Sequence, residues 1–124
     1  MSDLTDAIGG VCRLVAGDPT AAAVARGLGE VIDEQEDAVQ VRPRDAHFDD
    51  AYVVHEDDGE VLHVDLALRE PAPLTDLESA FGDARAAPRR PRRPRQLLFT
   101  VGECTVIASV ADDAVSAVTV RRDA

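Results

Sequence analysis

Apolar residues recur along this chain with two different periods, one typical of helices and one typical of strands. Helical spacing runs over residues 4–15 and again over 19–32, where Asp18 is placed to cap the alanine-rich second segment. A third, shorter helix is predicted from Thr75, which begins a capping box, to Gly82, which ends it. The pattern therefore predicts three short helices.

Strand-like segments fill most of the remaining chain. They are separated by short, turn-forming stretches, and they cover residues 39–41, 52–56, 60–69, 97–101, 104–110 and 114–121. The resulting order is α-α-β-β-β-α-β-β-β. Adjacent strands joined by short turns predict an α+β fold, with a mostly antiparallel sheet of about six strands and the helices packed on one face. We expect residues 1–124 to form a single domain.

The hairpin around Asp57, Asp58 and Gly59 is regular enough for its register to be predicted. A three-residue turn with Gly59 in the left-handed conformation pairs Val54 with Leu62. Alternation then gives the strands one buried face and one exposed face. The residues expected to be buried are Tyr52, Val54, Leu62, Val64, Leu66 and Leu68, and those expected on the other face are Val53, His55, Val61, His63, Asp65 and Arg69.

Two segments offset by roughly 54 residues share a faint pattern, which predicts tandem α-β-β-β repeats at 18–70 and 74–122. In the second copy a short helix ends at Phe81-Gly82, and the strands that follow lead to an Asp112-Asp113 turn and a Val-x-x-Val-x-Val strand. This arrangement resembles the small helix-plus-sheet unit of the SmpA/BamE-type domains. A tandem of such units resembles the beta-lactamase inhibitor proteins of streptomycetes. The resemblance implies an α+β fold, and we carry no binding residue over from it.

Charge is distributed unevenly along the sequence. The formal net charge is −11, yet residues 1–88 alone hold 20 Asp and Glu against 6 Arg, a balance of −14. An acidic body repels nucleic acid and anionic membrane over most of its surface, and with three Phe, one Tyr and no Trp, residues for stacking bases are scarce. A basic loop at 88–95 has the opposite sign. The predicted partner-binding residues are Arg89, Arg90, Arg92, Arg93 and Arg95 in that loop, with Asp57 and Asp58 in the acidic turn.

Candidate chemistry is sparse. His55, His63 and Asp65 form the nearest approach to a metal site, because two imidazoles and a carboxylate suit zinc or iron. The competing interpretation is polar residues on the exposed face of a sheet. Cys12 and Cys104 lie in apolar segments, which indicates reduced, packed thiols, with a disulfide between them as the alternative. No phosphate-binding loop or nucleophile motif is present, so we predict no cofactor and no enzyme.

The function that fits these features is non-catalytic protein binding, as an immunity, inhibitor, adaptor or chaperone-like subunit with a basic partner. The acidic surface would speed encounter, and the Arg-rich loop would set orientation. Two alternatives are a small-molecule or metal-binding function on the exposed sheet face, and a homo-oligomeric structural subunit associating through Val53 and Val61. The acidic N-terminus and the lack of a long apolar run predict a cytoplasmic protein without membrane contact. The excess of Ala, Val, Asp and Arg indicates a GC-rich bacterial source.

Overall fold

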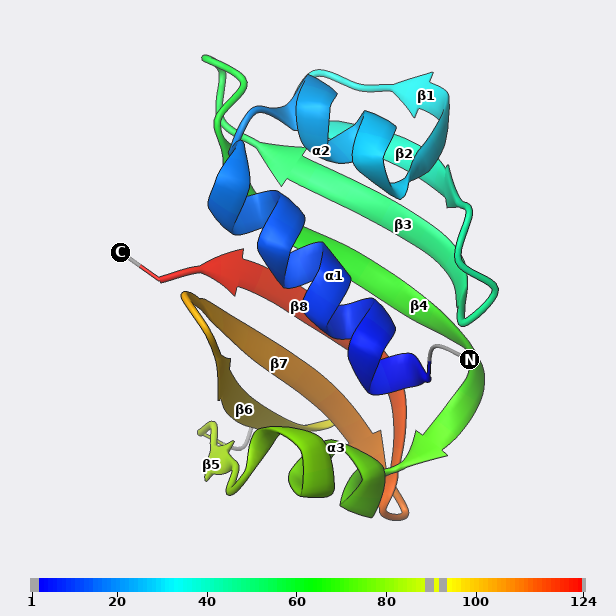
Figure 1. Ribbon diagram of the computed structural model, residues 1–124, viewed down its shortest axis with the longest axis vertical. Helices are drawn as coiled ribbons and strands as arrows, with labels where there is room; N and C mark the ends of the chain where they lie inside the picture. The colour runs from blue at the N-terminus through cyan, green and yellow to red at the C-terminus, as the bar shows by residue number, and fades with distance from the viewer. Residues whose placement is uncertain (1–2, 89–90, 92–93, 124) are drawn as a thin grey trace.

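Three helices cover one face of an eight-stranded sheet in the computed structural model, which describes residues 3–88, 91 and 94–123 (Figure 1). The helices are α1 (Leu4–Gly17), α2 (Ala21–Leu28) and α3 (Leu74–Phe81). The strands are β1 (Gly29–Glu34), β2 (Ala38–Pro43), β3 (Phe48–His55), β4 (Val61–Pro73), β5 (Arg85–Ala86), β6 (Arg95–Val101), β7 (Cys104–Ala111) and β8 (Ala114–Arg122).

The sheet has the order β1-β2-β3-β4-β8-β7-β6-β5, and every neighbouring pair is antiparallel. The predicted α+β class, antiparallel sheet and one-sided helices are confirmed. Across the described residues the sheet has eight strands instead of about six, because the two edge strands β1 and β5 were not predicted. Each half of the chain places a helix before four consecutive strands, and β4 and β8 meet at the centre of the sheet. The tandem repeat itself stays a prediction.

Strand β1 occupies part of the segment predicted to be helical. Helix α2 ends at Leu28, and Gly29 follows as its C-cap. A Cβ at position 29 would collide with the carbonyl oxygen of Arg42 on β2. Glycine therefore permits the close approach that lets the chain leave the helix and pair at once with β2, and this pairing overrides the helical spacing of Val31 and Ile32.

The helix starts also differ from the prediction by a residue or two. Thr20, and not Asp18, is the N-cap of α2, while the Asp18 carboxylate accepts hydrogen bonds from the Thr20 backbone N–H and hydroxyl at 3.2 and 3.0 Å. Helix α3 begins at Leu74 after Pro73, without a side-chain cap, so the predicted capping box at Thr75 is not formed. Its end at Gly82 is confirmed.

The core between the helices and the sheet is mainly aliphatic. Helix α1 runs diagonally across the sheet and packs on β7 and β8, α2 covers β1 to β3, and α3 lies beside β4 and β6 (Figure 1). Fully buried side chains include Ile8 and Val15 from α1, Val24 from α2 and Leu77 from α3. The largest buried sheet residues are Phe48 and Phe99. Burial of this kind supplies the main driving force for folding.

The predicted faces of the β3–β4 hairpin are wrong near the turn. His55 pairs with Val61 but Val54 pairs with His63, so Leu62 is an extra residue in β4 and forms a bulge. The bulge reverses the alternation: the side chains that pack beneath the helices are Val53 and Val61, with 0% and 8% exposure, whereas Leu62 is 47% exposed. Tyr52 and Val54 are only partly buried, while Val64, Leu66 and Leu68 are buried as predicted.

Candidate functional site

The acidic turn and Arg95, the described arginine of the basic loop, were predicted to contribute to one binding surface, but they lie in distant parts of the fold. Asp57 and Asp58 are exposed in the β3–β4 turn, where the Asp58 carboxylate accepts a hydrogen bond from the Glu60 backbone N–H at 2.9 Å. Arg95 is exposed at the start of β6, and through β7 it is in register with Val115, near the start of β8. The acidic turn lies near the other end of β8, because β4 leaves this turn and pairs with β8 at Val120. The two therefore occupy opposite ends of the strands. The other predicted arginines lie outside the described residues, and they are Arg89, Arg90, Arg92 and Arg93.

The predicted His-Asp cluster is divided between the two faces of the sheet. His63 Nε2 lies 3.3 Å from Asp65 Oδ2 on the face away from the helices, and the Thr119 hydroxyl donates to the other Asp65 oxygen at 2.7 Å. His55 instead lines a pocket beside α2, because the Leu62 bulge changes the relation between the strands. Within the ranges that the structure describes, no three His, Cys, Asp or Glu side chains are placed to hold a metal ion.

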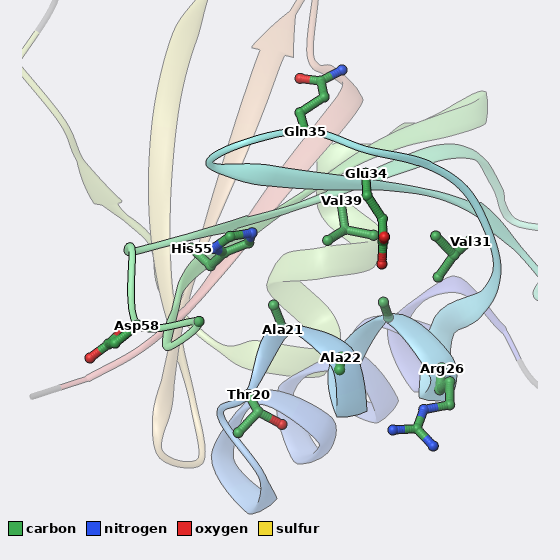
Figure 2. Close-up of a pocket in the computed structure, with 12 residues that line it drawn as sticks. Thr20, Ala21, Ala22, Arg26, Val31, Glu34, Gln35, Val39, His55 and Asp58 are labelled. Atoms are coloured by element: carbon green, nitrogen blue, oxygen red, sulfur yellow. The ribbon is translucent and has the colours of Figure 1, made fainter.

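A pocket of about 540 Å³ lies between α2, the β1–β2 hairpin and the β3–β4 turn (Figure 2). Its apolar part comes from alanines of α2 together with Val31 and Val39. The carboxylate of Glu34 and the imidazole of His55 extend over this apolar surface from two sides, whereas Gln35 points away from it (Figure 2). The ring of His55 is held by a 2.8 Å contact between Nδ1 and the Glu56 carbonyl oxygen. The small residues of α2 leave space that larger side chains would fill.

In the β1–β2 hairpin beside this pocket, most of β1 and the turn that follows it are exposed. Every residue from 30 to 37 is exposed, including Val31 at 39% and Ile32 at 42%. Residues 29–43 hold five acids and one Arg, a formal charge of −4. This exposed surface was not predicted from the sequence, because residues 29–32 follow the helical spacing of the preceding segment. The Leu28-Gly29 pair is the signal that could have revealed it.

The two cysteines are buried and free, and they contact each other's segments. The Cys104 thiol donates to the Cys12 carbonyl oxygen at 3.4 Å. Burial raises the pKa of Cys12 to about 12, and it also raises the pKa of Cys104. Neutral, buried thiols are poor nucleophiles, so these residues contribute to packing and not to a reactive centre.

A search of family models and a search of curated proteins each found no match. Among solved structures, the fold is similar to that of YjgB, a DUF4309 family protein from Bacillus subtilis subsp. subtilis str. 168, with a TM-score of 0.62. The similarity covers 86% of this chain and 80% of that chain at 10% sequence identity, and it shows a shared fold alone. In the described part of this chain, none of the helices has the length and apolar character needed to cross a membrane.

Proposed function

We propose that this protein is a non-catalytic binding module whose partner is a basic protein. The observation that carries the proposal is the acidic charge of residues 1–88, which is −14 and is largely exposed. Within the described residues, two Arg–carboxylate pairs come within 4.0 Å, namely Arg42 with Glu30 and Arg69 with Asp49. All four side chains are more than half exposed, so solvent screens these pairs strongly. Most of the acidic surface is therefore available to an external cation.

Charge of this density favours fast, electrostatically steered association with a complementary surface. Val53 and Val61 are buried against the helices, so they are not the exposed contacts that the self-association alternative predicted. The role of the Arg-rich loop in orienting the partner stays a prediction. The acidic surface alone is sufficient for the mechanism proposed here.

The test is affinity capture with the purified chain from a lysate of the source organism at about 50 mM and about 0.5 M salt, because screening at the higher salt shortens the range of exposed charges to a few Å. We expect one basic protein to be recovered stoichiometrically at low salt and lost at high salt. The purified pair should then show an association rate that falls steeply with ionic strength, with a smaller change in dissociation rate. Capture that is unchanged at half-molar salt, or no capture at either salt, would contradict the proposal.

A further inference from the structure

Strand β1 is an exposed edge of the sheet, with one bulge between Val31 and Asp33. In the described ranges it pairs with β2 alone, so the backbone N–H and C=O groups along its outer side have no neighbouring strand. Its six residues extend over about 20 Å. The opposite edge is different, since β5 is only two residues long. An exposed edge of this length is a template for another strand.

The side chains around this edge select against some partners and favour others. The five acids of the hairpin are Glu30, Asp33, Glu34, Glu36 and Asp37, and all are exposed. Two copies of this edge would repel each other, because each hairpin has a charge of −4. A segment rich in Lys or Arg would be attracted. Exposed Val31 and Ile32 provide apolar contact for such a segment.

The pocket beside the hairpin can accept one long cationic side chain, because Arg26, which also lines it, points its guanidinium away from Glu34 (Figure 2). Lys and Arg bury an aliphatic stem on apolar surface while the charged head stays near water. Here the stem would lie on the apolar lining, which includes Ala21, Ala25 and Val39. The head would reach the carboxylate of Glu34, which extends over this lining (Figure 2). Because Glu34 belongs to β1 itself, the pocket and the open edge are adjacent parts of one surface.

We propose that β1 is the docking edge for an extended, basic segment of the partner protein, which joins the sheet as an additional strand and places one Lys or Arg side chain in the pocket at Glu34. Main-chain hydrogen bonds would provide affinity, and the pocket and the acids would provide specificity. The inference rests on the proposed function, and it specifies where and in what conformation the basic partner binds.

The test uses the peptide acetyl-Lys-Val-Lys-Val-Lys-Val-amide with the intact protein. Its control is the same peptide with alternate backbone nitrogens methylated, which keeps every side chain and charge but removes the hydrogen-bond donors on one side. By calorimetry at low salt we expect the methylated peptide to bind about tenfold more weakly. Hydrogen exchange of the β1 amides should slow when the unmodified peptide is bound. Equal affinity of the two peptides, or unchanged β1 exchange, would overturn strand addition.

The protein variants test the pocket separately. Glu34→Gln should weaken binding of the unmodified peptide about tenfold, because the cationic head loses its charged partner. Glu103→Gln is the matched control, since it removes one exposed carboxylate from the β6–β7 turn and should leave binding unchanged. Ala22→Leu, at an exposed position that lines the pocket, should also weaken binding by filling the space. Circular dichroism confirms that each variant is folded. Equal effects of Glu34→Gln and Glu103→Gln would overturn the pocket.

Two outcomes separate this inference from the proposed function. If a basic partner is captured in a salt-dependent way but binds Glu34→Gln as tightly as the wild type and does not protect β1, the docking edge is wrong and the proposed function stands. If neither a basic partner nor the basic peptide binds, both fail. Light scattering that shows a concentration-dependent dimer with protected β1 amides would identify a second copy as the occupant and overturn the basic segment.

Discussion

Replacing Val53 by Ala tests the observed register of the β3–β4 hairpin. Val53 is 0% exposed beneath the helices, so the substitution removes two fully buried methyl groups. At about 0.8 kcal/mol for each group, with an additional cost for the cavity that remains, the expected loss is about 2 to 3 kcal/mol of unfolding free energy. For a domain of this size the melting temperature should fall by about 10 °C.

The neighbouring residue provides the control. Val54 is only partly buried on the opposite face, so Val54→Ala should cost less than about 1 kcal/mol. Urea unfolding followed by far-UV circular dichroism is the suitable assay, because the chain has no Trp and a single Tyr. The slope of the free energy against urea should be equal in both variants. A larger loss for Val54→Ala than for Val53→Ala would refute the register.

Three further predictions concern the thiols, one turn and the bulge. Cys12 stays neutral in the folded protein up to a pKa of about 12 but ionises from its ordinary value of 9.0 when unfolded, so unfolding free energy should fall as pH rises through this interval. Between pH 8 and pH 10, the unfolding free energy measured by urea titration should decrease by about 1 kcal/mol less in Cys12→Ala than in the wild type. An equal decrease in the two proteins would contradict the raised pKa of Cys12. Asp113 has a φ of 60°, so Asp113→Gly should raise the unfolding free energy by about 0.5 kcal/mol and Asp113→Ala should lower it by about 1 kcal/mol, as measured by urea unfolding. Changes of the same sign in both variants would be inconsistent with a strained turn. Deleting Leu62 should leave a regular hairpin with the same buried face at a cost below about 1 kcal/mol, whereas deleting Leu66 should abolish the cooperative thermal transition.

Elements with strong local signals were predictable from the sequence. The last hairpin is an example, since two alternating runs flank the Asp112-Asp113 turn, and both residues adopt the positive φ values, 52° and 60°, that a two-residue hairpin turn requires. The end of α3 at Gly82, with φ 90°, is another. In these places the residue type and the backbone conformation agree.

Features that depend on contacts between distant segments were not predictable. From the sequence, Gly29 is compatible with the end of a helix or with an unfavourable position inside one. Only the close approach of the Arg42 carbonyl oxygen shows that the helix ends there. The Leu62 bulge is similar. The turn residues allow a regular hairpin, but the need to bury both Val61 and Val64 against the helices favours an extra residue between them. The same bulge places His55 and His63 on opposite faces of the sheet. The predicted cluster of His55, His63 and Asp65 was therefore wrong because the predicted hairpin register was wrong.

The two halves of the sheet have the same order of elements but end in different edges, and this difference favours the first half as the binding region. The second half ends in β5, which is too short to add a strand of useful length. The first half ends in β1, where the proposed function would have the hairpin acids both oppose pairing between identical copies and attract a basic segment. Under this proposal the same five acids would limit self-association and select the partner. Neutralising the five hairpin acids together should accordingly have two effects: the variant should no longer bind basic peptides, and it should self-associate through β1. A variant that no longer binds basic peptides but stays monomeric would show that the acids do not prevent self-association.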